Sequence, residues 1–233
     1  MLVFHIFTIF PESFRSYFET SILKRAQEKK LLKIKIYNIR DFAEGKHKIT
    51  DEKPFGGGAG MVLKAQPIIE AVLNVLKRIT RSAGKQKKSK IIVFSAKGKQ
   101  FNQKTAYDFS KKYTDIFLIC GRYEGIDERV KLALNAQEIS IGPYVLTDGE
   151  APAMVVVSSI SRLLPGAIRL ESLQEESFFN TVLRKEKKGA LEYPHYTRPE
   201  IFEFKGKKYR VPKVLLSGNH KKIAEWREKN SRS

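Results

Sequence analysis

Short apolar segments alternate with helical patterns along the first two thirds of the chain, and this alternation restricts the fold more than any other feature. Residues 2–10 form a continuous apolar run of strand length, and residues 32–36 alternate at the period of a strand with one solvated face. Three more short, β-branched segments follow at residues 91–95, 116–120 and 138–141. Strands that alternate with helices form parallel sheets covered on both faces. We therefore predict a parallel α/β fold.

The predicted helices carry apolar residues on one face. Pro11 suits the first turn of a helix, and apolar residues recur behind it at every fourth position: Phe14, Phe18, Ile22 and Ala26. A second stripe at helical spacing occupies residues 68–79, and further helices are predicted at about 102–113 and 126–136. These helices would cover the sheet.

The regular pattern lapses beyond Arg169. Residues 171–189 are highly charged, which predicts a linker. A small unit follows, with a possible strand pair at about 202–211 and a last helix that Asn219 caps. We therefore predict a main domain at 1–168, a flexible linker at 169–190 and a short, mainly helical C-terminal domain at 191–233.

The charge of the chain indicates the class of its partner. The 44 Lys and Arg exceed the 25 Asp and Glu, which gives a net charge of +19, and such a field attracts polyanions. The densest basic stretch, residues 78–90, is either a solvated loop or a surface that contacts phosphates. No apolar run reaches the ~18 residues of a membrane span, and the N-terminus lacks a secretion signal. We expect a cytoplasmic protein that binds nucleic acid and no membrane.

Several familiar catalytic templates are excluded. The single cysteine, Cys120, rules out a disulfide framework or a Cys-based zinc site and resembles a packed small thiol more than a nucleophile. The glycine-dense loop at 55–61 lacks the Gly-Lys-Ser/Thr of a P-loop and does not open a helix after a strand, as a dinucleotide fingerprint does. There is no Gly-x-Ser-x-Gly elbow of a hydrolase.

Two loops at the ends of predicted strands can bind a ligand. Residues 120–129 leave a buried strand and contain Gly121 and Gly125, which let the backbone approach a ligand closely. Residues 141–150 combine Gly and Pro with Ile, Val and Leu, so backbone polar groups lie beside apolar side chains. That combination can hold a flat heterocycle, and ligands of open α/β sheets lie at the carboxyl ends of strands. Either loop alone would be an ordinary connection between elements.

Six motifs in one order resemble the TrmD family of bacterial tRNA (guanine-N1)-methyltransferases. They occupy residues 57–61, 120–129, 140–150, 161–166, 193–199 and 215–220, and the resemblance extends from the first strand to Trp226. It implies a fold of the SPOUT class, with a trefoil knot on the C-terminal side of the methyltransferase domain. It also implies a homodimer with its active site at the subunit interface and S-adenosylmethionine bent into the knot. The implied substrate is the guanosine immediately 3′ of the anticodon in tRNA, and the resemblance implies that the C-terminal domain at 191–233 binds the tRNA.

The resemblance implies roles for individual residues. Those that bind the cofactor would be Phe94, Ser95, Ala96, Gly121, Tyr123, Glu124, Ile141, Gly142, Pro143, Tyr144, Val145, Leu146, Gly149 and Pro152. Those on the tRNA side would be His47, Lys48, Gly57, Gly58, His195 and Arg198. Arg162 matches the catalytic arginine, whose fixed charge can stabilise an anion forming at guanine O6. In the alternative interpretation, Arg162 is a structural residue that bonds the unpaired carbonyls at the end of a helix.

The sequence departs from the family pattern at the general base. The family has an aspartate before Ser-Phe in the linker, whereas this chain has Glu176 there. Glu176 is then the group that removes the guanine N1 proton. Two further departures lie in the cofactor loop, where Asp148 replaces a glycine and Pro143 replaces an acidic residue.

Three carboxylates near the predicted cofactor site have two interpretations. Glu124, Asp127 and Glu128 could seat Mg²⁺, or they could pair with Arg122 and Arg129. Ion pairing is favoured because a metal needs convergent oxygens, so no metal ligand is assigned. Two other functions stay open from the sequence: a related knotted methyltransferase with another target atom in RNA, and a basic RNA-binding protein without catalysis.

Overall fold

The computed structural model describes residues 1–81, 88–169, 173, 178 and 192–231. It divides into two compact units, residues 1–168 and residues 169–233. Most of the predicted linker at 169–190 lies outside the described residues, so its boundaries stay predictions.

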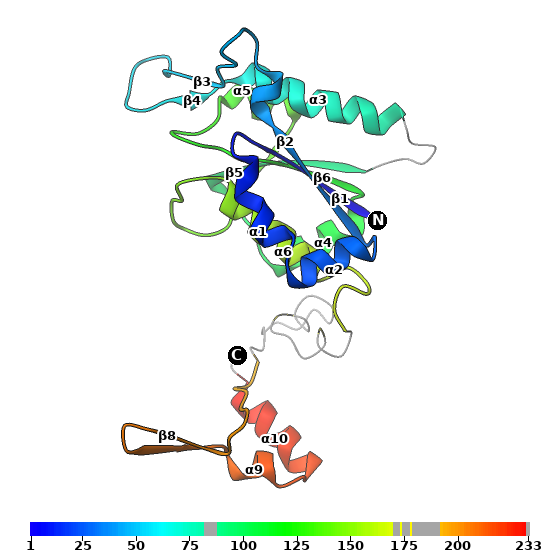
Figure 1. The fold of residues 1–233 in the computed structure, drawn as a ribbon, viewed down its shortest axis with the longest axis vertical. Helices are drawn as coiled ribbons and strands as arrows, with labels where there is room; N and C mark the ends of the chain where they lie inside the picture. Colours follow the sequence, from blue (N-terminus) through cyan, green and yellow to red (C-terminus); the bar gives the residue numbers. More distant parts are fainter. Residues whose placement is uncertain (82–87, 170–172, 174–177, 179–191, 232–233) are drawn as a thin grey trace. The chain divides into compact units, whose positions relative to one another are not determined.

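The first unit is built on a five-stranded parallel sheet (Figure 1). Its strands are β1 (Leu2–Thr8), β2 (Leu32–Asn38), β5 (Ser89–Gln100), β6 (Asp115–Ile119) and β7 (Gln137–Ser140). They lie in the order β2-β1-β6-β5-β7, and every neighbouring pair is parallel. The predicted parallel α/β fold is therefore confirmed, and it agrees with the SPOUT class. The trefoil knot stays a prediction.

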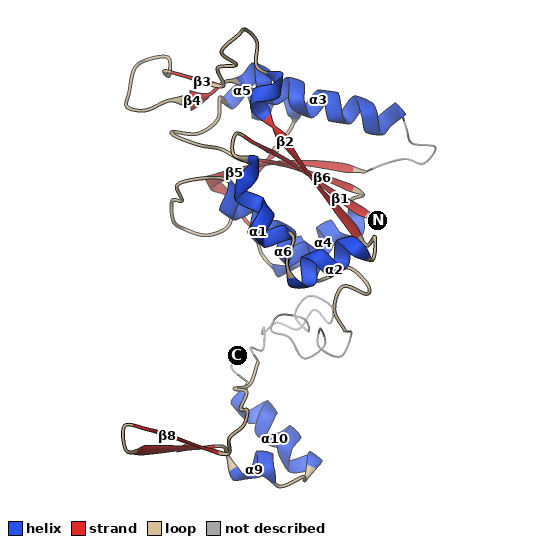
Figure 2. Ribbon diagram, in the orientation of Figure 1, coloured by secondary structure: helices blue, strands red, loops and turns tan. Residues whose placement is uncertain are grey.

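Helices cover both faces of this sheet, as Figure 2 shows. One face carries η1 (Pro11–Phe14), α1 (Arg15–Phe18), α2 (Ser21–Glu28), α4 (Gln103–Lys112) and α6 (Glu150–Ser161), and the other carries α3 (Ala65–Arg81) and α5 (Glu128–Leu134). Each face has its own buried apolar cluster. The shorter elements are η2 (Ile39–Phe42), β3 (Asp51–Glu52) and β4 (Val62–Leu63). None of the helices in the described ranges is long and apolar enough to cross a membrane.

The prediction of one continuous helix after Pro11 is wrong, because the helix is interrupted. The chain leaves the helix after Phe18, and Thr20 is extended, so α2 restarts with a different phase. As a result Ile22, expected on the inner face, is 36% exposed, and Leu23 is buried in its place. The predicted inner residues Phe14, Phe18 and Ala26 are buried.

Strand β5 is longer than predicted and contains an irregularity that matters for the site. Its pairing with β7 shifts register between Phe94 and Lys99. Gly98 lies in this shift, where a Cβ atom would fall 2.6 Å from the backbone nitrogen of Ile139. Only glycine allows two backbones to approach this closely. The bulge therefore interrupts the regular ladder after Phe94, and pairing resumes at Lys99.

Within residues 192–231, the second unit contains a hairpin and two helices. The hairpin pairs β8 (Ile201–Phe204) with β9 (Lys207–Arg210), and the helices are α9 (Lys213–Leu216) and α10 (His220–Asn230). The Asn219 side chain accepts the backbone N–H of Lys222 at 3.1 Å, which confirms the predicted cap. Trp226 of α10 lies edge-on to Tyr193 and Tyr196, with ring centroids 6.5 and 6.2 Å away.

Candidate cofactor and active site

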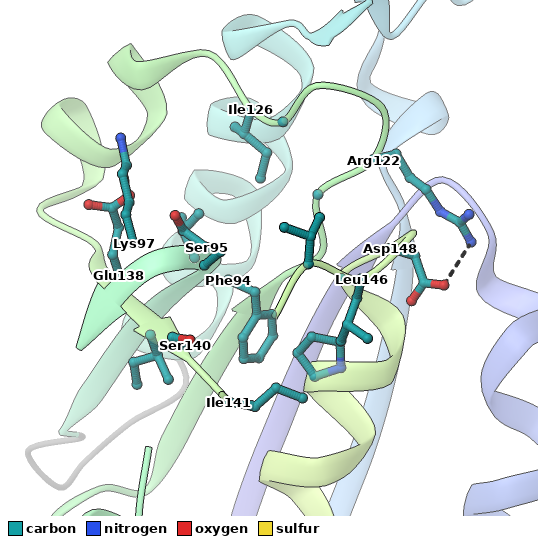
Figure 3. Close-up of a pocket in the computed structure, with 18 of the residues that line it drawn as sticks. Phe94, Ser95, Lys97, Arg122, Ile126, Glu138, Ser140, Ile141, Leu146 and Asp148 are labelled. Atoms are coloured by element: carbon teal, nitrogen blue, oxygen red, sulfur yellow. Dashed lines mark ion pairs between the residues drawn. The ribbon is translucent and has the colours of Figure 1, made fainter. Parts of the chain in front are cut away.

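A cavity of about 280 Å³ lies at the carboxyl ends of β6 and β7, beside the bulge in β5 (Figure 3). Its walls come from residues 93–97 at the bulge of β5, residues 121–128 after β6, and residues 138–142 and 144–149 around the end of β7. Lys131 of α5 and Pro152 of α6 complete the lining. Every predicted cofactor residue except Pro143 lines this cavity. The two loops singled out in the sequence therefore border one common space.

The cavity has an apolar middle and charged ends. Phe94, Ile141 and Leu146 lie between the two ends in Figure 3. At one end Lys97 Nζ lies 3.7 Å from a carboxylate oxygen of Glu138. At the other, Arg122 Nη2 lies 3.9 Å from Asp148 Oδ2. An apolar slot between polar groups suits a flat ring system that carries polar substituents.

Glycines bring the two loops into direct contact. The Gly149 N–H donates to the carbonyl of Gly121 at 2.9 Å. A Cβ atom on Gly149 would lie 2.5 Å from the Gly121 nitrogen and 2.6 Å from Cys120 Cα. Both neighbours are backbone atoms of a buried strand end, so they cannot turn away as a side chain could. The position of the second loop therefore depends on the absence of a side chain at Gly149.

Replacing Gly149 with alanine should separate the two loops. Overpacking against fixed backbone costs about 3 kcal/mol, which lowers the melting temperature by roughly 6–12 °C for a domain of this size. Thermal unfolding followed by circular dichroism measures this change, and calorimetric titration with S-adenosylhomocysteine should show binding weakened at least tenfold.

Gly121→Ala is the matched control for this variant. A Cβ atom at Gly121 would lie 3.4 Å from the Ile126 side chain, an ordinary contact, so its melting temperature should stay within a few degrees of the wild type. Equal losses of stability in the two variants would contradict the backbone clash at Gly149.

The cavity residue Arg122 forms an ion pair with Glu150, a buried residue of α6. Arg122 Nε lies 3.2 Å from Glu150 Oε2, and the Glu150 side chain is only 3% exposed. The Thr8 hydroxyl donates to the other oxygen of Glu150. The Arg122 guanidinium also lies 4.6 Å from the centroid of the Phe10 ring. Burial raises the pKa of the Glu150 carboxyl, although Thr8 and Arg122 oppose that shift.

Asp148 lies two residues before helix α6 and bonds its first turn. Its carboxylate accepts the backbone N–H of Ala151 at 2.9 Å and the hydroxyl of Thr147 at 3.1 Å. Burial pushes the pKa of Asp148 up, but these hydrogen bonds and the Arg122 charge outweigh it, so the pKa lies below its usual value. The Asp148 side chain therefore bonds the first turn of α6 and is a second partner for Arg122.

Ion pairs hold two of the three neighbouring carboxylates. Asp127 Oδ2 lies 2.6 Å from Arg129 Nη2, and Glu128 pairs with Lys131 and with Lys97. The expected partnership of these groups with Arg122 is wrong, since Arg122 pairs with Asp148 and Glu150 instead. Within the described ranges, no group of three His, Cys, Asp or Glu residues could hold a metal ion.

Cys120 is fully buried at the end of β6. Burial raises its pKa well above that of a free thiol, and the nearby Glu150 and Asp148 charges raise it further. A thiol held in its protonated form is a poor nucleophile. The interpretation of Cys120 as a packed small side chain is therefore supported.

The glycine-dense loop predicted on the tRNA side borders one wall of the cavity. Gly57 and Gly58 are exposed and have positive φ angles of 82° and 123°. Where the loop ends, the carbonyl of Met61 accepts the N–H of Glu124 at 3.0 Å. A Cβ atom on Gly60 would meet the side chain of the same Glu124 at 2.6 Å. Two motifs that are sixty residues apart in sequence therefore lie side by side.

Other predicted substrate residues lie elsewhere. His47 and Lys48 are exposed, and His47 borders a separate cavity of about 250 Å³ with Lys64. His195 and Arg198 are exposed in the second unit, where His195 Nε2 lies 3.4 Å from Glu192. Of the basic stretch at 78–90, residues 82–87 lie outside the described ranges.

Neither predicted catalytic residue lines the cavity as the structure describes it. Arg162 is exposed and directly follows Ser161, the last residue of α6. Arg162 follows the cavity residue Pro152 by ten positions, so it lies roughly 15 Å along the helix from the cavity. Glu176 lies outside the described residues.

Sequence reasoning missed several residues of the cavity. Lys97 and Glu138 lie on the wall beyond Phe94, and Ser140 and Ile126 also line it. Lys97 was missed because the strand was predicted to end at residue 95, before the bulge. Gly98 was the available signal, since a glycine inside a strand pattern often marks such a bulge. Arg122 was noted only as a partner for neighbouring carboxylates.

Comparison with known proteins identifies the family. The family model described as "tRNA (Guanine-1)-methyltransferase TrmD" matches residues 2–233. A tRNA (guanine-N(1)-)-methyltransferase of Clostridioides difficile is 51% identical over 98% of this chain and 91% of its own. Proteins of the same name from Dictyoglomus turgidum and Dehalococcoides mccartyi are 50% and 48% identical, over 99% and 97% of this chain and 85% and 84% of theirs. With that coverage, the chain belongs to the TrmD family of tRNA (guanine-1)-methyltransferases.

Proposed function

We propose that this protein transfers a methyl group from S-adenosylmethionine to N1 of the guanosine immediately 3′ of the anticodon in tRNA. The observation that carries the proposal is the cavity at the strand ends, where glycine-bearing loops border an apolar slot with charged ends. Membership of the TrmD family supports the same reaction. A net charge of +19 suits a polyanionic substrate, and a tRNA substrate assigns the reaction to the cytoplasm.

The lining of the cavity fits an adenosine joined to a charged amino-acid group. Phe94, Ile141 and Leu146 would hold the flat adenine by apolar contact. Gly121 lines the cavity without a side chain of its own, so its backbone N–H can bond the polar edge of the ring. Bound S-adenosylmethionine supplies an electrophilic methyl group on its sulfonium.

Arg162 acts from a second copy of the chain. Arg162 does not line the cavity of its own copy, and its distance along α6 from that cavity supports a shared site. The exposed apolar residues at the mouth of the cavity support the same arrangement, since Val145 is 87% and Tyr144 52% exposed. The guanidinium stabilises negative charge at guanine O6 while the methyl group is transferred.

Glu176 removes the proton from guanine N1. Its place before Ser177 and Phe178 corresponds to the aspartate of the family, and glutamate is the same base on a stem one methylene longer. A carboxylate within hydrogen-bonding reach of N1 leaves the ring nitrogen with the electron pair that attacks the methyl group. The two roles are complementary, because the anion formed by Glu176 is the one that Arg162 stabilises.

The experiment that tests the proposal is direct product analysis. Purified protein is incubated with S-adenosylmethionine and an unmodified tRNA transcript that carries two successive guanosines at the 3′ edge of the anticodon. We expect 1-methylguanosine after nuclease digestion, and none from a transcript in which the second guanosine is adenosine. A methylated ribose or another methylated ring atom would overturn the target. If the protein neither methylates the transcript nor gives binding heat with S-adenosylhomocysteine, the proposed enzymatic activity is overturned.

A further inference from the structure

The β8–β9 hairpin of the second unit displays three exposed aromatic rings. Phe202 and Phe204 on β8 are 55% and 53% exposed, and Tyr209 on β9 is 49% exposed. Phe202 and Tyr209 are direct partners across the hairpin, and Phe204 is two residues along the strand, so all three share one face. The rings of Phe202 and Phe204 are nearly parallel, at 11°, with centroids 6.5 Å apart. Within its own unit, this face has flat aromatic surface open to solvent.

The turn of the hairpin fixes this arrangement. Lys205 and Gly206 form a two-residue loop, and both have positive φ angles, 49° and 73°. Such a turn has the twist that two antiparallel strands require. The register from Ile201 to Phe204 is therefore set by the turn.

Cations flank the aromatic face. Lys205 Nζ lies 5.5 Å from the centroid of the Phe204 ring, and Lys207 Nζ lies 5.3 Å from that of Tyr209. The single acidic residue of the hairpin strands, Glu203, points to the opposite face and pairs with Lys208 at 3.8 Å. The aromatic face therefore combines π surfaces with uncompensated positive charge.

We propose that this face binds unpaired nucleobases of the tRNA by stacking on Phe202, Phe204 and Tyr209, while Lys205 and Lys207 contact the adjoining phosphates. Proteins that bind single-stranded nucleic acid combine aromatic rings with a positive groove in this way. A protein partner that covered three aromatic rings would favour an apolar rim, whereas the rim here consists of lysines. The identity of the RNA as tRNA rests on the proposed function.

Paired substitutions on the aromatic face test the stacking. Phe202→Leu with Phe204→Leu keeps apolar volume but removes the π surfaces, and we expect it to raise the Kd for the unmodified transcript roughly tenfold or more. Phe202→Tyr with Phe204→Tyr should bind within about threefold of the wild type, because the rings remain. Ile201→Ala on the opposite face of the same strand is the matched control and should leave the Kd unchanged.

The salt dependence separates stacking from charge. In plots of log Kd against log salt, the leucine variant should give a line parallel to the wild type. Lys205→Ala with Lys207→Ala should flatten the slope by about 0.7 for each lost phosphate contact. A fully paired RNA duplex, which offers no free bases, should bind the leucine variant and the wild type equally.

Two results would overturn the proposal. One is a leucine variant that binds the transcript with the wild-type Kd. The other is a leucine variant that binds weakly only because its association state changes in sedimentation, which would make the face a contact between protein copies. Circular dichroism and thermal unfolding of the full-length variants verify that they are folded, because S-adenosylhomocysteine binding reports only on the first unit. The wild type should methylate the correct guanosine at saturating tRNA. If it does, the stacking proposal can fail without contradicting the proposed function.

Discussion

Arg122→Met should lower the stability of the protein by roughly 3–5 kcal/mol at pH 8, and by much less at pH 5. Removing one partner of a buried ion pair leaves the other charge uncompensated, and here the group left behind is Glu150, whose side chain is 3% exposed. At pH 5 much of that cost is avoided, because Glu150 can bind a proton. Thermal unfolding between pH 5 and 8 measures the difference, with an expected loss of about 6–20 °C at the alkaline end.

The direction of this pH dependence follows from the pKa of Glu150. Burial already raises that pKa in the folded wild type, and Arg122 opposes the rise. Without the guanidinium, the folded-state pKa moves further above that of the unfolded chain. Stability from such a group is fully present below the unfolded pKa and is lost as the pH rises through the folded pKa. The variant therefore loses stability relative to the wild type as the pH increases.

Two further variants isolate the ion pair. Arg122→Met combined with Glu150→Gln has no buried charge, so the additional loss of melting temperature that Arg122→Met shows at pH 8 should disappear. Arg122→Lys keeps a cation and should fall between the wild type and Arg122→Met. A loss in Arg122→Met that is equal at every pH would mean that packing on Phe10, rather than the charge of Glu150, explains the effect.

The sequence predicts the sheet because each strand can be recognised from the pattern of apolar residues within its own segment. Residues 32–36 alternate apolar and basic residues, and the corresponding strand β2 is the edge of the sheet. Residues 116–120 are apolar throughout, and β6 in the centre is fully buried. Where a helix is interrupted, the same reasoning fails. The inner face predicted through Ile22 assumed one continuous helix, and the extended Thr20 changes its phase.

The location of the candidate site was predictable, and its electrostatics were not. Glycine-bearing loops at strand ends point to the carboxyl edge of a parallel sheet, which is where the cavity lies. The partners of Arg122 depend on how residues 148–150 fold back over β6, and no local pattern contains that contact. The same holds for Glu124, which meets Met61 across sixty residues of sequence. Long-range contacts of this kind come from the topology as a whole.

Replacing Glu176 with glutamine should slow methyl transfer by roughly 10²- to 10⁴-fold in single turnover, the range that a positioned general base contributes. Glutamine has the same shape but cannot accept the N1 proton, so the Kd values for tRNA and S-adenosylhomocysteine should not change. Glu175→Gln is the matched control, since it removes the same charge one residue earlier in the chain and should keep the wild-type rate.

Glu176→Asp then tests the reach of the base. It restores the residue type of the family but shortens the stem by one methylene in a chain that has a glutamate here. A misplacement of about 1 Å can cost up to 10²-fold, so we expect a rate between those of Glu176→Gln and the wild type, with no change in either Kd. An inactive Glu175→Gln beside an active Glu176→Gln would reassign the base to Glu175. If both glutamine variants keep the wild-type rate, the proton leaves N1 by another route, and stabilisation of the anion by Arg162 becomes the main contribution of the protein to that step.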